Sequence, residues 1–326
     1  IIWSECILAA SGKWNSSGSC NFFQFDNGNN QREKGKIMKL GLNLSFAVKR
    51  WMEPEILAKI CKEDFKIEHI QFSWDFIDPW WSEKERNSIA RQYRDAFNSF
   101  GLVIDSNFAG NAAYTFPHFL GPIKEQRNLA LEYFKRAVDV SLELGTDIIG
   151  SPAGGMSNKV SYDSKLREEA YKEMLEYLFV LAEYASKSGI KEIQIEATPL
   201  ETEFPHSPGA SLKLMEDLSG SSIPYKLLID WGHALFRPLL KEEADIDIWF
   251  ERCKKYIGGI HLQQTDGLYD RHWDFTNPNG IITPEKILEA TKKAGLDDIY
   301  QYLEVVTAYE EKDEIVFENL FDLYTA

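Results

Sequence analysis

The chain has 326 residues, 44% of them hydrophobic, which suffices for one large domain or two small ones. It contains no apolar run of the ~20 residues that span a bilayer, so we expect no membrane partner. Its formal net charge of −15 argues against a nucleic-acid partner, because broad nucleic-acid surfaces bind phosphates through Lys and Arg. The four cysteines form no CxxC pair, which indicates reduced thiols and a cytoplasmic location.

The first 37 residues differ in character from the rest of the chain. They start with Ile instead of Met, are rich in Asn, Gly and Ser, and show no sustained periodicity. No basic region precedes the apolar patch at residues 1–10, as a secretory signal would require. We therefore expect residues 1–37 to be a disordered leader of non-native or upstream origin, with the native protein starting at Met38. A truncated targeting segment is the alternative.

From Met38 onward, short apolar segments alternate with amphipathic ones. The apolar segments predict strands that are buried on both faces, as the strands of a parallel sheet are. These predicted strands lie at residues 39–46, 67–75, 102–110, 147–155, 192–199, 225–233, 257–266 and 300–306.

Between the predicted strands, apolar residues recur every three or four positions, which predicts helices that face a sheet. Gly101 and Gly145 stand just before the next strands, where glycines commonly end helices. Eight strand–helix units in ~290 residues predict a single-domain (β/α)8 TIM barrel over residues 38–326. A doubly wound open sheet is the alternative, although no GxGxxG follows the first strand. The predicted stripes are Ile89, Tyr93, Ala96 and Phe100; Ala130, Phe134, Ala137, Ser141 and Leu144; and Tyr171, Met174, Leu178 and Leu181.

Four predicted strands carry a metal-ligand side chain at the carboxyl end, namely Glu196, Asp230, His261 and Glu304. The active site of a parallel barrel lies at this end, and consecutive strands are neighbours, so these side chains should converge. Three converging carboxylates would repel one another and become protonated unless a divalent cation lies between them. An oxygen-rich set without thiolate favours Mn²⁺ (manganese) or Mg²⁺, with Co²⁺ or Zn²⁺ as alternatives.

Residues beyond two of these strand ends are candidates for substrate binding. His233 follows Asp230 by three residues, and we expect it to donate a hydrogen bond to a substrate oxygen near the metal. The loop after residue 262 is dense in polar side chains, and loops over a barrel mouth carry specificity. In this loop, Gln263 suits a sugar hydroxyl, and Arg271 with His272 suits an anionic group such as phosphate. A solvated polar loop is the alternative.

The pattern of Glu196, Asp230-x-x-His233, His261 and Glu304 resembles the xylose isomerase-like TIM barrel superfamily of sugar isomerases and epimerases. The similarity runs from Met38 to the C-terminus and is greatest to the ketose 3-epimerases. The segments IHLQQTDGLYDRHWDF and IEATPLETEFPHSP resemble the branch that acts on erythrulose phosphate. The resemblance implies a metal-dependent 3-epimerase in which Glu196 and Glu304 exchange the C3 proton of a ketose through a cis-enediolate. It also implies a small sugar or sugar phosphate as the partner, and a homo-oligomer.

The chain departs from the hexulose epimerases at two positions. Thr202 and Gly267 stand where those enzymes carry a Glu and an Arg, which argues against a free hexulose as substrate. Aldose–ketose isomerases and dehydratases of cyclitols or dehydroshikimate share the fold and stay open as alternatives. An apurinic-site endonuclease would need more His and Asp ligands and a basic face. A non-catalytic binding barrel would not need both Glu196 and Glu304 at one cation.

Overall fold

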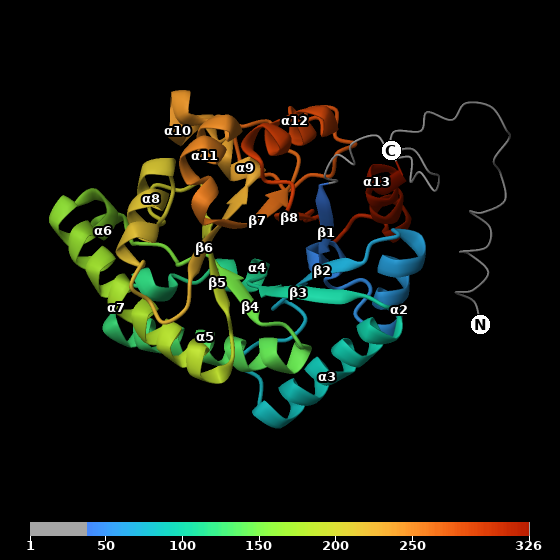
Figure 1. Ribbon diagram of the computed structural model, residues 1–326, viewed down its shortest axis with the longest axis horizontal. Coiled ribbons are helices and arrows are strands. Elements are labelled where there is room, and N and C mark those ends of the chain that lie inside the picture. The colour runs from blue at the N-terminus through green and yellow to red at the C-terminus, as the bar shows by residue number, and fades with distance from the viewer. Residues whose placement is uncertain (1–37, 326) are drawn as a thin grey trace, which may run out of the picture.

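The computed structural model describes residues 38–325, and the leader expected at residues 1–37 lies outside this range. The strands pair in parallel and in sequence order, and β8 closes onto β1 to form a barrel (Figure 1). This arrangement confirms the predicted (β/α)8 fold and excludes the open sheet. The strands are β1 (Lys39–Asn43), β2 (His69–Ser73), β3 (Val103–Phe108), β4 (Ile148–Ser151), β5 (Glu192–Ala197), β6 (Tyr225–Asp230), β7 (Ile257–Leu262) and β8 (Tyr300–Leu303).

One main helix follows each strand, and these helices surround the strands (Figure 1). In chain order they are α2 (Pro54–Lys59), α3 (Glu83–Ser99), α5 (Lys124–Leu144), α7 (Ser164–Ser188), α8 (Pro208–Asp217), α11 (Ile246–Cys253), α12 (Pro284–Ala294) and α13 (Asp313–Thr325). Shorter helical segments extend the connections: η1 (Leu44–Ala47), η2 (Ile60–Asp64), α4 (Asn111–Tyr114), η3 (His118–Leu120), α6 (Asn158–Tyr162), α9 (Trp231–Ala234), α10 (Arg237–Leu240), η4 (Lys241–Glu243) and η5 (Lys254–Tyr256).

Two of the three predicted apolar stripes are buried in full, on α5 and α7. On α3, Tyr93 and Ala96 of the predicted stripe are buried, and Ile89 and Phe100 are half-buried and pack against the core. The buried face of α3 also includes Ala90, next to Ile89, and Phe97, next to Ala96. Gly101 and Gly145 adopt φ values of 71° and 86°, the left-handed conformation expected of glycines that end helices.

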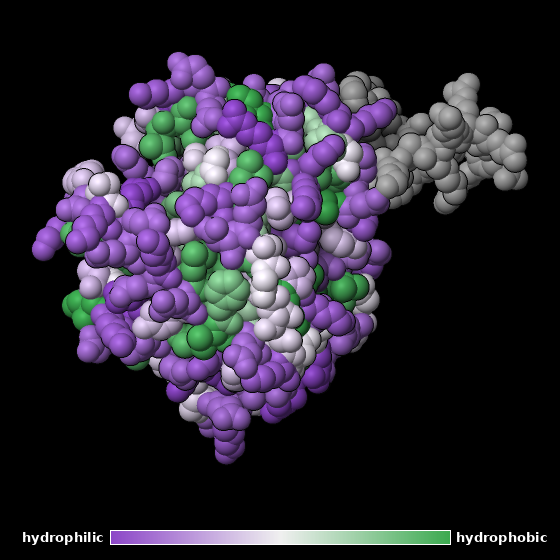
Figure 2. Space-filling view, turned by 60° about the vertical axis from the view of Figure 1, so that its left-hand side comes forward, coloured by the Kyte–Doolittle hydropathy of each residue, from purple (hydrophilic) through white to green (hydrophobic). Residues whose placement is uncertain are grey.

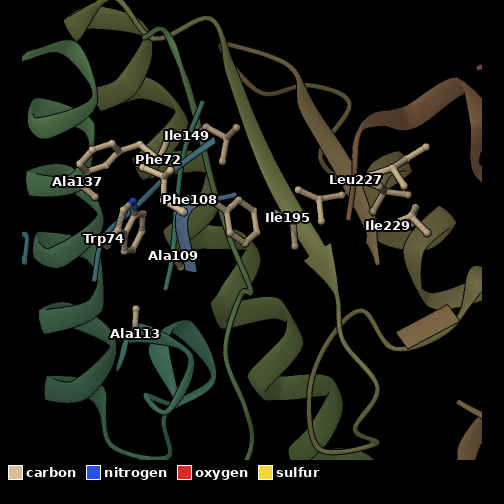
Figure 3. Packing of buried hydrophobic residues seen from close by; sticks show 14 of the residues in the cluster. Phe72, Trp74, Phe108, Ala109, Ala113, Ala137, Ile149, Ile195, Leu227 and Ile229 are labelled. Carbon is tan, nitrogen blue, oxygen red and sulfur yellow. The ribbon is translucent and has the colours of Figure 1, made fainter. Parts of the chain in front are cut away.

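The apolar core lies between the strands and the surrounding helices. Figure 3 shows Phe72 and Trp74 directed toward the helix that carries Ala137. Trp74 also packs edge-on against Phe134 of α5, with ring centroids 5.5 Å apart. Such packing removes apolar surface from water and holds the strand ends in fixed positions.

The face shown in Figure 2 is mainly hydrophilic, with a smaller hydrophobic area near its centre. Over residues 38–325, no helix has the length and apolar character that crossing a membrane requires. Cys61 and Cys253 are buried free thiols, which agrees with the predicted reduced state for these two residues. The other two cysteines precede the described range.

The stability of the fold should depend on pH through His118. Burial lowers the pKa of His118 to about 4, and its Nε2 donates a hydrogen bond to the Ala113 carbonyl, 2.8 Å away. The unfolded chain takes up this proton near pH 6.5, so the stabilisation is complete above that pH and is lost as the pH falls toward about 4. Over this window wild type should lose about 3 kcal/mol more unfolding free energy than His118→Asn. Denaturant titrations across this pH range measure the difference, and equal losses in both proteins would contradict it.

Candidate active site

The carboxyl ends of four consecutive strands bring together Glu196, Asp230, His261 and Glu304. Asp230 of β6 pairs with His261 of β7 in the sheet, and the Glu304 amide donates to the Leu262 carbonyl at 2.9 Å. All four side chains are buried, and one ligand atom from each lies within 4.8 Å of the others. The convergence expected from the sequence is therefore present; the metal-binding and catalytic roles of the four residues stay predictions.

The hydrogen bonds of this cluster fit a bound cation. Asp230 Oδ1 accepts from the His233 amide at 2.9 Å and from Gln263 Nε2 at 2.8 Å. Asp230 Oδ2 is buried and has no hydrogen-bond partner among the described residues. A buried carboxylate oxygen without a donor is costly unless a cation is bound to it. The donor set of three carboxylates and one imidazole suits an oxygen-preferring divalent metal.

The orientation of His261 is set from the opposite side of the barrel interior. Its Nε2 lies 2.6 Å from Oε1 of Gln71 on β2. This oxygen also accepts from Asn43 Nδ2 at 2.7 Å, while Gln71 Nε2 donates to Ser106 Oγ at 3.2 Å. Because an amide oxygen only accepts, Nε2 carries a proton and Nδ1 faces the carboxylates. Gln71 was not among the residues predicted from the sequence, where its only signal is a polar side chain inside an apolar strand.

The electrostatics around His261 reflect its two glutamate neighbours. Its Nδ1 lies 3.1 Å from Glu196 Oε1 and 2.7 Å from Glu304 Oε2. Burial alone would lower the pKa of His261, but these carboxylates outweigh it and raise the pKa to about 10. Burial raises the pKa of Glu196. Burial also acts to raise the pKa of Glu304, but His261 and His272 outweigh it, so the pKa of Glu304 is lowered.

A cavity of about 90 Å³ opens onto this cluster. Segments that follow five of the strands, β1, β3, β4, β6 and β7, contribute to its wall, together with the two glutamates. The lining residues are Ser45, Phe108, Ala109, Gly110, Asn111, Tyr114, Pro152, Glu196, His233, Asp270, His272 and Glu304. A larger cavity of about 480 Å³ lies against α5, but its wall is mainly apolar and contains no carboxylate. The chemistry therefore belongs to the smaller cavity.

Of the predicted substrate-binding residues, His233 and His272 line the small cavity, and Gln263 and Arg271 do not. Gln263 is fully buried and does not line the cavity. Its side-chain amide forms hydrogen bonds with Asp230, Asp270 and the backbone of His272. Arg271 is held by a carboxylate of its own loop, because its Nη2 and Nε lie 2.7 and 3.1 Å from one oxygen of Asp266.

Sequence reasoning also missed two acidic residues near the cavity. Asp270 lies between His233 and His272, 3.2 and 3.1 Å from their Nε2 atoms. Glu203 is buried and accepts a hydrogen bond from Tyr114 Oη at 3.3 Å, and burial raises its pKa. The sequence placed Glu203 next to Thr202, where the hexulose epimerases carry their further Glu. Only its burial distinguishes it from Glu201 on the other side.

Known epimerases are among the proteins similar to this chain. The D-erythrulose 1-phosphate 3-epimerase of Brucella abortus (strain 2308) is 26% identical over 268 residues, covering 80% of this chain and 86% of the relative. A crystal structure of D-psicose 3-epimerase with D-fructose has a TM-score of 0.65 at 13% identity, over 87% of this chain and 96% of that one, and shows the shared fold. The Brucella abortus relative is named as an epimerase, which is an isomerase, in agreement with the predicted enzyme class.

Similarity to a third protein is higher. The crystal structure of a putative xylose isomerase from Rhodospirillum rubrum ATCC 11170 has a TM-score of 0.86 and 41% identity, over 88% of this chain and 97% of that one. The family model described as "Xylose isomerase-like TIM barrel" matches residues 65–319. The resemblance inferred from the sequence is thereby confirmed, and the chain belongs to the family of xylose isomerase-like TIM barrels.

Proposed function

We propose that this chain is a divalent-metal-dependent 3-epimerase of a ketose, with a phosphorylated four-carbon ketose as the substrate. The observation that supports it best is the placement of two buried glutamates beside one imidazole nitrogen, at 3.1 Å for Glu196 and 2.7 Å for Glu304. Epimerisation requires a base on each face of the reacting carbon. A single base working on one face would instead give aldose–ketose isomerisation.

The chemistry divides between the cation and the two carboxylates. Glu196, Asp230, His261 and Glu304 would hold the cation, with Mn²⁺ or Mg²⁺ preferred to Co²⁺ or Zn²⁺ for an oxygen-rich set. A cation held there polarises the ketose carbonyl and contributes several kcal/mol of charge stabilisation. One glutamate removes the C3 proton, and the other returns a proton to the opposite face. A positioned carboxylate contributes roughly 10²–10⁴-fold to such a transfer.

The substrate assignment rests on the Brucella abortus relative and on the side chains of the cavity wall. That relative is named for erythrulose 1-phosphate, a four-carbon ketose ester. The basic side chains in the cavity wall are His233 and His272, which we assign to the substrate oxygens. The cytoplasmic location and the homo-oligomer remain predictions.

Proton NMR in D₂O with tetrulose phosphates, pentuloses and hexuloses, and with a cyclitol and dehydroshikimate for the dehydratase alternative, tests the proposed reaction. An epimerase introduces deuterium at C3 and inverts the configuration there. Label at C1 with an aldose product would identify an isomerase instead, and loss of water from a cyclitol or dehydroshikimate would identify a dehydratase. Comparing phosphorylated with free erythrulose tests the phosphate preference.

Arg271→Ala should leave the preference for a phosphorylated substrate nearly unchanged. The guanidinium is already paired with Asp266, and its carbon lies over the rings of Tyr269 and Trp273, 4.4 and 4.7 Å from the ring centroids. We expect the KM for erythrulose phosphate to stay within about threefold of wild type, because a neutralised arginine outside the cavity adds little to anion binding. A much larger rise in KM, absent for free erythrulose, would assign the phosphate to Arg271.

A further inference from the structure

We propose that Asp270 is a positioning residue that holds His233 and His272 in place for substrate binding. The inference rests on the proposed function, because it assigns these two histidines to the ketose. Asp270 itself lies in the loop between β7 and α12, and its side chain is 26% exposed in the cavity wall.

Both carboxylate oxygens of Asp270 are used. Oδ2 lies 3.2 Å from His233 Nε2, and Oδ1 lies 3.1 Å from His272 Nε2. Oδ1 also accepts from Gln263 Nε2 at 3.0 Å. A carboxylate has two oxygens, so it can pair with two protonated imidazole rings from different loops at once. Asp270 therefore links the loop after β6, which carries His233, to the loop after β7, which carries His272.

The other ring nitrogens differ in how they are held. His233 Nδ1 lies 2.9 Å from the Ala197 carbonyl at the end of β5. His272 Nδ1 lies 3.6 Å from Glu304 Oε2 and has no hydrogen-bond partner among the described residues. The two rings are nearly perpendicular, with centroids 5.8 Å apart. Asp270 thus supplies a second contact for the His233 ring and a carboxylate contact for the His272 ring, and without it both rings could rotate out of the cavity wall.

The backbone on either side of Asp270 is anchored to the barrel. The His272 amide donates to Gln263 Oε1 at 2.5 Å, and the Val306 amide donates to the His272 carbonyl at 2.9 Å. Gln264 and Trp273 exchange two backbone hydrogen bonds, of 2.9 and 3.2 Å. A loop held in this way places the Asp270 carboxylate accurately, as a group that orients others must be placed.

The test compares Asp270→Asn with Asp270→Glu in the metal-loaded enzyme. Asn keeps the shape but offers one acceptor oxygen, so it can support only one ring. We expect Asp270→Asn to raise the KM for the ketose about 10–100-fold, the usual effect of losing an orienting partner, with kcat within about threefold. Asp270→Glu restores two acceptor oxygens and should recover part of the lost KM. Wild-type KM in Asp270→Asn would overturn the proposal.

A second measurement does not depend on catalysis. The ¹⁵N signals of the His233 and His272 rings, assigned with His→Gln variants, should both shift in Asp270→Asn without substrate. Ring signals unchanged by the substitution would overturn the positioning role even if the enzyme epimerises. Shifted signals in a protein that epimerises no ketose would instead refute only the proposed function.

Asp274→Asn is the matched control, because Asp274 lies in the same loop and accepts hydrogen bonds from the Thr276 amide and Asn319 Nδ2. It should leave KM and both ring signals unchanged. Metal analysis completes the test, with one divalent ion expected per chain in wild type and in Asp270→Asn. Two ions in wild type and one in the variant would make Asp270 a metal ligand and overturn the proposal.

Discussion

Replacing Glu304 with Gln should lower kcat for epimerisation by roughly 10²–10⁴-fold, the usual contribution of a positioned general base. Glu304 is buried directly after β8, and its Oε2 lies 2.7 Å from His261 Nδ1. Gln has nearly the same shape but cannot accept the C3 proton. Glu196→Gln should have an effect of similar size, because inversion requires a base on each face. Steady-state kinetics and metal content, measured together, separate a lost base from a lost cation.

Isotope exchange distinguishes two bases from one. In D₂O, Glu304→Gln should exchange the C3 proton of one epimer only, through the remaining Glu196 and without inversion. Glu196→Gln should exchange the proton of the other epimer. Exchange of the same epimer in both variants would contradict the two-base arrangement. Glu192→Gln is a suitable control, because Glu192 lies at the opposite end of β5 and accepts from Gln194 Nε2.

Removal of divalent cations should abolish activity, and Mn²⁺ should restore it. The reason is the buried cluster itself, in which Glu196, Asp230 and Glu304 approach one another and Asp230 Oδ2 has no donor among the described residues. A cation relieves the repulsion among these carboxylates. An enzyme should lose turnover after chelation, whereas a binding barrel would have no turnover to lose.

Asp230→Asn provides a test that is independent of turnover. A ligand that binds only the folded protein stabilises it by about 2.7 kcal/mol at a hundredfold excess over its Kd. Mn²⁺ should therefore raise the Tm of the chelator-treated wild type, and the rise should be largely absent in Asp230→Asn. Calorimetry and elemental analysis measure both effects. An equal rise in Tm in both proteins would place the cation elsewhere.

The local pattern of the chain determined the barrel and the positions of the four strand-end residues. Alternation of apolar strands with amphipathic helices is a property of neighbouring residues, and a closed parallel barrel brings all carboxyl ends of its strands to one face. Glu196, Asp230, His261 and Glu304 could therefore be placed together before any contact was known. The stripes of α5 and α7 follow from helical spacing in the same way.

Tertiary structure alone decided which polar groups hold this cluster and which face the cavity. Gln71 reaches His261 from β2, and Asp270 reaches His233 from another loop, and no spacing in the sequence encodes either contact. Arg271 and Gln263 had suitable chemistry for a substrate, but the conformation of the loop after β7 directs them to other partners. The reason is physical: strand and helix periodicity are local, whereas a long polar side chain bonds to whichever partner the closed barrel brings near it.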